Sequence, residues 1–268
     1  MPLPPGVIAA DTITKLPPEA DGAVILSGSH GGVYPGYLAA KAKVRAVIFN
    51  DAGVGRDEAG VGSLAYLEAL GIAAATVSNL SCRIGDTADM VARGVISRVN
   101  GFAVDVDVTA GMSCAEAAGL LRMTRPRHKE PPPIGEGRTE AATGGNRRII
   151  LIDSAAMVKP EDAGQIIVTG SHGGLVGGNP AMALRTEGFA AVFHDAGIGI
   201  DDAGITRLSA LDRRGIAAFT VAGGSARIGD AKSIFQDGEI SAVNETAQKL
   251  DAHVGYRACE VLERWASL

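Results

Sequence analysis

Three short motifs that carry reactive side chains occur twice in this chain. GSHGG at 28–32 returns at 170–174, DAGVG at 51–55 returns as DAGIG at 195–199, and RIGD at 83–86 returns at 227–230. The second copies lie 142 residues further along for the first motif and 144 for the other two. A repeat of this length matches a small domain and is too long for a solenoid unit. We therefore predict two homologous lobes, produced by an internal duplication and related by a pseudo-twofold axis.

The two GSHGG copies place an imidazole among small residues. A histidine titrates near neutral pH, so we predict His30 and His172 as catalytic acid–base residues. Glycine N–H groups can approach an anion or a developing oxyanion. We assign substrate binding to the small residues Ser29, Gly31, Gly32, Ser171, Gly173 and Gly174. The alternative is that these glycines only turn the chain tightly. A divalent metal is a weaker alternative, because two histidines in different lobes match a metal site poorly.

The aspartates and arginines of the other motifs have two interpretations each. Asp51 and Asp195 follow apolar runs and could orient a catalytic histidine, or they could stabilise the following turn. Arg83 and Arg227 could bind a carboxylate or phosphate group of the substrate, or they could pair with an aspartate of their own loop. The last residue of each RIGD copy, at 86 and 230, precedes a helical pattern and is predicted to be a helix N-cap.

The two copies differ beside these motifs. Asn50 in the first copy corresponds to His194 in the second, and SNLSC at 78–82 corresponds to AGGSA at 222–226. If one shared cleft has specialised walls, Cys82 and Asn79 act on one wall, with Asn50 binding substrate, and His194 acts on the other. A cysteine beside an arginine and a helix start could serve as a nucleophile, whereas a buried cysteine would be inert.

Short apolar runs alternate with helical patterns in each copy. Strands are predicted at 23–26, 46–49 and 72–77, and again at 165–168, 190–193 and 216–221, with an additional first strand at 6–13 and 148–154. Helices are predicted over 57–71 and 201–215, each ending at a glycine. Continuous apolar strands separated by helices indicate an α/β fold, with a mainly parallel sheet flanked by helices in each lobe. The motifs follow strands, so we expect them to gather at the carboxyl edges of the sheets.

The pattern divides the chain into a first lobe at 1–123, a linker at 124–146 and a second lobe at 147–268. The linker is rich in proline, glycine and charged residues, so it is predicted to be a solvated surface segment.

A net charge of −5 and 4% aromatic residues argue against a nucleic-acid partner. No apolar stretch approaches the roughly 20 residues of a membrane span, and no signal peptide is recognisable. Three cysteines at wide spacing suit neither disulfides nor zinc. We expect a cytoplasmic protein without a nucleotide cofactor, and a homo-oligomer remains open.

These observations predict an enzyme of small-molecule metabolism. The first hypothesis is hydrolysis of a carbon–nitrogen bond, in an amide or cyclic amide of a small polar or anionic substrate. It uses a histidine base, an aspartate that orients it, a glycine-rich oxyanion cradle, and either Cys82 or water as nucleophile. The same groups could instead run an isomerase, racemase or lyase reaction. The non-enzymatic alternative is a module that binds a small anion, in which the histidines only donate hydrogen bonds.

Overall fold

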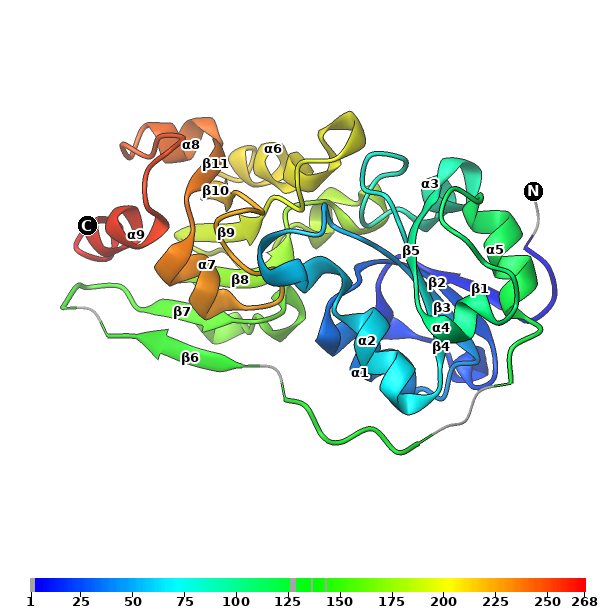
Figure 1. Ribbon diagram of the computed structural model, residues 1–268. Coiled ribbons are helices and arrows are strands. Elements are labelled where there is room, and N and C mark those ends of the chain that lie inside the picture. The colour runs from blue at the N-terminus through cyan, green and yellow to red at the C-terminus, as the bar shows by residue number, and fades with distance from the viewer. Residues whose placement is uncertain (1–2, 126–128, 136, 143) are drawn as a thin grey trace.

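The structure, a computed structural model, describes residues 3–125, 129–135, 137–142 and 144–268. Within these residues the chain forms two mixed sheets, of five and six strands, and each is flanked by helices (Figure 1). The predicted α/β fold class is confirmed at this level. We call residues 3–125 the first half and residues 137–268 the second half, which contain one sheet each. No helix among the described residues combines the length and apolar character needed to cross a bilayer.

The first sheet is built in chain order. Its strands are β1 (Val7–Ala10), β2 (Val24–His30), β3 (Ala46–Asn50), β4 (Ala73–Val77) and β5 (Ile96–Val99). The pairs from β1 to β4 are parallel, and β5 runs antiparallel to β4. The helices are α1 (Val33–Lys41), α2 (Ser63–Leu70), α3 (Thr87–Arg93), α4 (Gly101–Val104) and α5 (Cys114–Leu121). Side chains of β2 and β3 alternate between two apolar clusters, one under α1 and α2 and the other under α3, α4 and α5. Both faces of the sheet are therefore covered, as continuous apolar strands require.

The second sheet has the same plan with one additional strand. Its strands are β6 (Arg138–Ala141), β7 (Ile149–Ile152), β8 (Ile166–His172), β9 (Ala190–His194), β10 (Ala217–Val221) and β11 (Ile240–Val243). Its helices are α6 (Thr206–Asp212), α7 (Ala231–Asp237), α8 (Glu245–Gln248) and α9 (Ala258–Ala266). The pairs from β7 to β10 are parallel, and the two edge strands run antiparallel.

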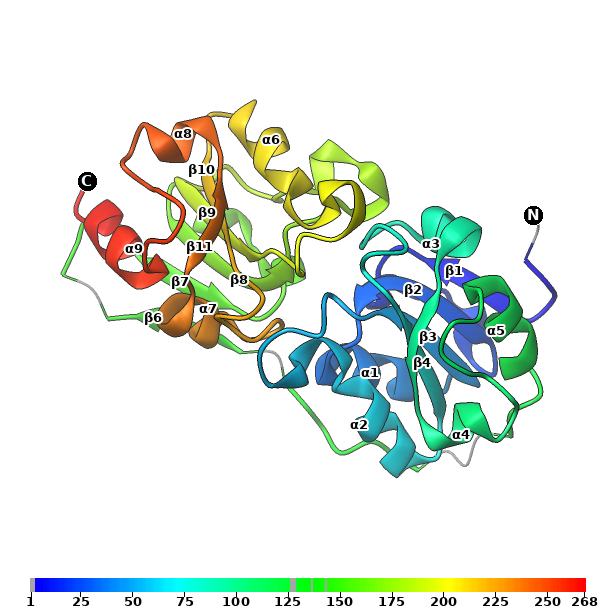
Figure 2. The same cartoon turned by 45° about the horizontal axis from the view of Figure 1, so that its top comes forward.

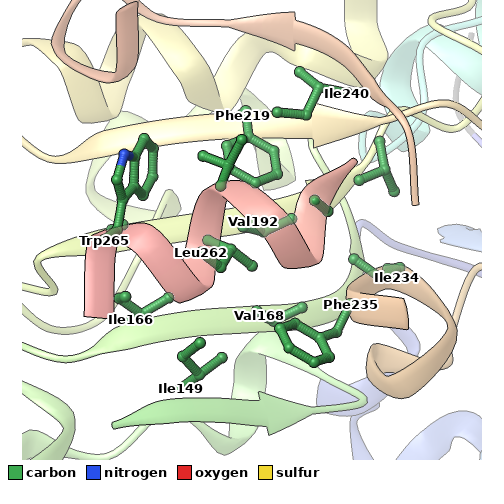
Figure 3. Close-up of a cluster of buried hydrophobic side chains, with 14 of the residues drawn as sticks. Ile149, Ile166, Val168, Val192, Phe219, Ile234, Phe235, Ile240, Leu262 and Trp265 are labelled. Carbon is green, nitrogen blue, oxygen red and sulfur yellow. The ribbon is translucent and has the colours of Figure 1, made fainter. Parts of the chain in front are cut away.

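Helix α9 closes one face of the second sheet. In Figure 3 this helix lies in front of the strands, and its Trp265 and Leu262 belong to the same buried cluster as Ile166, Val192 and Phe219. The indole of Trp265 is 1% exposed, and its Nε1–H donates to Leu250 O at 2.8 Å, so the buried ring leaves no polar atom unpaired. The opposite face is covered by α6 and by the segments that follow β7 and β8, which contribute Val158, Ala183 and Leu184.

The two halves differ in the segment after the second parallel strand. In the first half this segment is the nine-residue helix α1, whereas in the second half it consists of two 3₁₀ turns, Val176–Gly178 and Pro180–Met182. Helix α1 packs beside α2 on one face of the first sheet (Figure 2). The wall built beside the GSHGG motif is therefore helical in one half and irregular in the other.

The edge strands β5 and β11 were not predicted, because a four-residue strand with a single buried residue is a weak strand signal. An asparagine fixes the position of each. Asn100 receives the N–H of Ala74 at 3.0 Å and donates to Ile72 O at 2.9 Å, and Asn244 makes the matching bonds to Ala218 and Ile216. Each asparagine ends a segment that occurs in both copies, GVISRVN at 94–100 and GEISAVN at 238–244. Its presence in both copies therefore has a structural cause.

Part of the segment predicted to be a linker, 124–146, joins the second sheet. Residues Arg138–Ala141 form β6, which pairs antiparallel with β7 (Figure 1). Without β6, the outer edge of β7 would expose a row of backbone N–H and C=O groups, and an extended segment can pair with them. The guanidinium of Arg138 also pairs with the fully buried carboxylate of Asp162 at 2.6 Å.

The predicted helices over 57–71 and 201–215 are each broken in two. A 3₁₀ segment (Arg56–Val61 and Ile200–Ile205) precedes the shorter helix α2 or α6. Asp57 and Glu58 have left-handed φ angles of 54° and 55°, and Asp201 and Asp202 have 56° and 53°. Apolar residues at helical spacing do not reveal this interruption, because the residue types of both segments are compatible with a continuous helix.

Candidate functional site

A cavity of about 420 Å³ lies between the two halves. Its walls come from the segments after β1 and β2 in the first half, the segments after β7 and β8 in the second half, and the RIGD copy at 227–230. Both GSHGG histidines line it. The volume falls in the range of about 300–1,000 Å³ that small-molecule sites occupy. The predicted convergence therefore holds for the GSHGG copies, which meet in one shared cavity.

The two cavity histidines are hydrogen-bonded in the same way. Nδ1 of His30 accepts from the N–H of Gly32, and Nδ1 of His172 accepts from the N–H of Gly174, both at 3.2 Å. A neutral imidazole whose Nδ1 is an acceptor carries its proton on Nε2. Nε2 of each ring has no hydrogen-bond partner within the described residues. Each histidine therefore presents an N–H donor, and not a basic lone pair, to the cavity.

Burial keeps both rings neutral. It lowers the pKa of His30 from 6.5 to about 3, and the nearby His194 acts in the same direction. Burial also lowers the pKa of His172 well below 6.5, with the charge of Arg207 and the other two histidines adding to the effect. A base that does not accept a proton near neutral pH is poorly suited to general base catalysis.

Each histidine lies against the opposite half. A methyl group placed on Gly229 of the second half would lie 3.4 Å from Cε1 of His30. A methyl group on Gly85 of the first half would lie 3.3 Å from Cε1 of His172. Both glycines have left-handed φ angles, of 83° and 82°, so the two RIGD copies turn their backbone toward the imidazole across the boundary.

Arg207 lines the cavity and was missed in the sequence. Its side chain is 4% exposed, and burial lowers its pKa from 12.5 to about 10, which leaves it charged at neutral pH. Nε donates to Gly174 O at 3.0 Å, and Nη1 donates to the carbonyls of Met182 and Ala183 at 3.0 and 2.6 Å. No carboxylate pairs with Arg207 among the described residues. The sequence did contain a signal: the residue 144 positions earlier, in the first copy, is the uncharged Ser63, so the two copies differ in charge at this position.

The N–H groups predicted to form an anion cradle have partners inside the protein. Gly31 N donates to Asn50 O and Gly173 N donates to His194 O, both at 2.8 Å, while the N–H groups of the next glycine in each motif donate to the histidine rings. The glycines are required for packing, since a methyl group on Gly31 would lie 2.7 Å from Gly60 O. The alternative interpretation, that the glycines allow a close turn, therefore fits this geometry better.

The serines of the two motifs position neighbouring loops. Ser29 Oγ accepts from the N–H of Ile13 at 3.1 Å, and Ser171 Oγ accepts from the N–H of Ala155 at 2.9 Å. Both serines line the cavity, so they remain candidates for ligand contact.

Asp51 and Asp195 hold loops together. Oδ1 of Asp51 accepts from the N–H groups of Gly53 and Asn79 at 3.0 and 2.9 Å. Oδ1 of Asp195 accepts from Gly197 and Gly223 at 2.8 and 2.9 Å. Neither carboxylate bonds to a cavity histidine in the part of the chain that the structure describes. This is the turn-stabilising role, and it does not orient His30 or His172.

Asn50 and His194 make the same pair of bonds. Asn50 accepts from Ala52 N at 2.9 Å and donates to Cys82 O at 3.4 Å. His194 accepts from Ala196 N at 2.9 Å and bonds to Ala226 O at 3.1 Å. Both side chains are buried, outside the cavity lining. The larger side chain, His194, lies next to the smaller Ala226, and the smaller Asn50 lies next to the larger Cys82. The two differences between the copies therefore compensate each other in volume.

Cys82 is an unsuitable nucleophile in this structure. Its side chain is fully buried, and burial raises the pKa of its thiol from 9.0 to about 12. The reactive thiolate is therefore scarce at neutral pH. The alternative of an inert, buried cysteine agrees with this environment.

The arginines of the RIGD copies join the two halves. Arg83 pairs with Asp86 at 3.0 Å and with Asp201 of the second half at 3.1 Å. Arg227 pairs in the same way with Asp230 at 3.0 Å and with Asp57 of the first half at 3.1 Å. Arg227 lines the cavity and Arg83 does not. The predicted N-caps are confirmed, since Oδ1 of residue 86 accepts from Asp89 N and Oδ1 of residue 230 accepts from Ser233 N.

The DAG copies meet at the boundary between the halves. A small buried cluster there contains residues of both halves: Ala52, Ile84, Ala196, Ala203 and Ile228. A methyl group on Gly53 would lie 3.1 Å from Cα of Gly197. Asn79 Nδ2 also donates across the boundary to Ala196 O at 3.0 Å. The repeated DAG motif therefore serves association of the halves, and Asn79 contributes to it instead of facing the cavity.

No cluster of three or more His, Cys, Asp or Glu side chains suited to a metal ion occurs in the described ranges. Comparison with models of protein families, with curated proteins and with solved structures yields no match.

Proposed function

We propose that the cavity between the halves binds a small anionic molecule. The observation that carries this proposal is Arg207, a buried guanidinium in the cavity wall without a carboxylate partner in the described structure. Burying a charge is costly unless an opposite charge compensates it, so a site of this kind favours an anionic ligand. The described lining contains four basic residues and two acidic ones, although the whole chain carries a net charge of −5.

The two acidic lining residues have partners already. The carboxylate of Asp153 accepts the N–H groups of Gly137 and Ala231 at 2.6 and 3.0 Å, and Asp230 caps α7 and pairs with Arg227. They neither compensate Arg207 nor orient a histidine. Because the proposed base, carboxylate and oxyanion cradle are not assembled, we favour anion binding over hydrolysis of a carbon–nitrogen bond, isomerisation or elimination.

We also propose that the halves arose by internal duplication and are related by a pseudo-twofold axis. Reciprocal contacts support this. The ion pair Arg83–Asp201 corresponds to the ion pair Arg227–Asp57: the two arginines are 144 residues apart, the two aspartates are also 144 residues apart, and both pairs have a distance of 3.1 Å. The bond from Arg56 N to Gly223 O is likewise matched by one from Ile200 N to Asn79 O, at 2.8 and 2.9 Å.

Replacing Arg207 tests the proposed function. Thermal unfolding is measured with acetate, hexanoate, hexanedioate and inorganic phosphate, and at least one of these is expected to raise the Tm of the wild-type protein. In Arg207→Gln the increase in Tm should be smaller and should correspond to an affinity for the anion that is at least about tenfold lower. The reason is that a charge-assisted hydrogen bond contributes about 1.5–3 kcal/mol.

Arg214→Gln is the matched control, since Arg214 also donates to two carbonyls, at 2.9 Å each, but lies outside the cavity lining. If Arg207→Gln does not fold, Arg207→Lys keeps the charge without the planar fork and should weaken binding less. Absence of any anion effect on the wild-type protein, or unchanged affinity in a folded Arg207 variant, contradicts the proposal.

Exchange of the cavity histidines separates hydrogen-bond donation from acid–base catalysis. The pair Asn50 and His194 shows that an asparagine in this chain can accept the N–H two residues on and still donate onward. We therefore expect His172→Asn to keep anion affinity within about threefold, whereas His172→Ala loses about 1 kcal/mol or more. The same two changes at His30, in the half without Arg207, should have smaller effects. Calorimetric titration of the four variants measures this, and a His172→Asn variant as weak as His172→Ala would rule out a donor role.

A further inference from the structure

We propose that the ligand is a monocarboxylic acid with an apolar body, bound once per chain, with its carboxylate at Arg207 and His172 and its body against α1. This inference rests on the proposed anion-binding function and names the class of anion. Three observations carry it: the number of free donors around Arg207, the asymmetry between the halves, and the apolar character of the wall opposite.

The donors at Arg207 suit two oxygen atoms. Nε and Nη1 of the guanidinium already donate to carbonyl oxygens, and Nη2 has no partner within the described residues. His172 adds one N–H from Nε2. The two side chains are joined through Gly174, whose carbonyl accepts from Arg207 Nε and whose N–H donates to His172 Nδ1. In this proposal a carboxylate takes one hydrogen bond from each of the two side chains, whereas a phosphate dianion requires more positive charge and more donors.

The corresponding place in the first half has no charge. Ser63 N donates to Gly31 O as Arg207 N donates to Gly173 O, both at 2.8 Å, so the two residues occupy matching positions. Ser63 is fully buried, and its Oγ is without a hydrogen-bond partner in the described structure. Only one half can therefore hold an anionic head group, and the two halves form one site.

The first half contributes an apolar wall instead. Helix α1 begins directly after GSHGG and places Val33, Pro35 and Leu38 on the cavity. Other apolar lining residues are Ile13, Ile134, Val176, Met182, Leu184 and Ile228. Among the other basic lining residues, Lys15 and Arg185 have exposed side chains, where a charge contributes little to binding, and Arg227 is already paired with Asp57 and Asp230. In the described lining, Arg207 is thus the buried charge without a carboxylate partner, and the wall at α1 is mainly apolar, which fits a single anionic head with an apolar body.

Calorimetric titration of the wild-type protein tests this class. Hexanoate is expected to bind with one site per chain, at least tenfold more tightly than hexanamide, which has the same shape without the charge. It should also bind at least tenfold more tightly than acetate, which has the head without the body. Tighter binding of hexanedioate or inorganic phosphate than of hexanoate, or two hexanoate sites per chain, would overturn the class while leaving anion binding intact. Failure of all four anions overturns the proposed function as well.

A second variant tests the placement of the body. Val33 is 44% exposed, so Val33→Asn should fold, and we expect it to weaken hexanoate at least threefold while leaving acetate unchanged. Val104→Asn, at a residue that is 50% exposed and outside the cavity lining, is the matched control and should change neither affinity. Equal loss of acetate and hexanoate in Val33→Asn, or no loss of either, would show that the body does not lie against α1.

Discussion

Gly204→Ala is expected to lower the free energy of unfolding by on the order of 3 kcal/mol, or to prevent folding. A methyl group on Gly204 would overlap the carbonyl oxygen of Asp195 and would lie 2.9 Å from that of Ile198. Both are backbone atoms, so no side chain can move aside to make room. The same segment also carries the boundary between the halves, and its displacement should weaken anion binding too.

Urea unfolding monitored by circular dichroism measures the effect of this substitution. Gly119→Ala is the matched control, because Gly119 lies in α5 with nothing within 4 Å of the added methyl group. Removing a glycine from a helix interior should stabilise the protein by up to about 1 kcal/mol. A loss below about 1 kcal/mol in Gly204→Ala would show that the loop after β9 can shift without cost.

The protein is also expected to lose stability steeply as the pH falls below about 6.5. In the unfolded chain each histidine binds a proton near that pH, whereas burial lowers the pKa of His30 to about 3 and also lowers those of His172 and His194. The unfolded state then binds more protons than the folded state, so the free energy of unfolding decreases with falling pH. The decrease begins near pH 6.5 and, for His30, ends only near pH 3.

His194→Asn isolates one of these contributions. Asparagine at this position should keep both buried hydrogen bonds, as Asn50 does in the first half, while removing a group that titrates. We expect the slope of the unfolding free energy between about pH 6 and 5 to decrease by up to about 1.4 kcal/mol per pH unit. The reciprocal change Asn50→His, with Cys82→Ala to make room, should increase it. An unchanged slope in His194→Asn would contradict the assignment of a buried, neutral imidazole.

The strands and their layers could be predicted because burial on both faces leaves a continuous apolar run in the sequence. The edge strands β5, β6 and β11 could not, because each has only four residues and at most one of them is buried, so no apolar run marks them. Arg138 illustrates this: its surroundings in the sequence indicate a solvated segment, and its pairing with β7 and with Asp162 becomes visible only in the folded structure.

The candidate site was predicted in part for a similar reason. Repetition drew attention to the GSHGG histidines, and both line the cavity, because a motif at the end of a strand lies where two halves can meet. Repetition also selected Asp51 and Asp195, whose role is to hold loops together at the boundary. Arg207 escaped because only the second copy has it, and a single charged residue within a helical pattern resembles a solvated surface position. The difference from Ser63 was the informative signal.

Because each cavity imidazole rests on backbone of the opposite half, the two halves are not free to diverge independently. A substitution in the glycine turn at 85 or 229 would first alter the setting of the histidine encoded in the other half of the gene. Adaptation to a new ligand would therefore require paired changes, which restricts the evolutionary routes open to this protein.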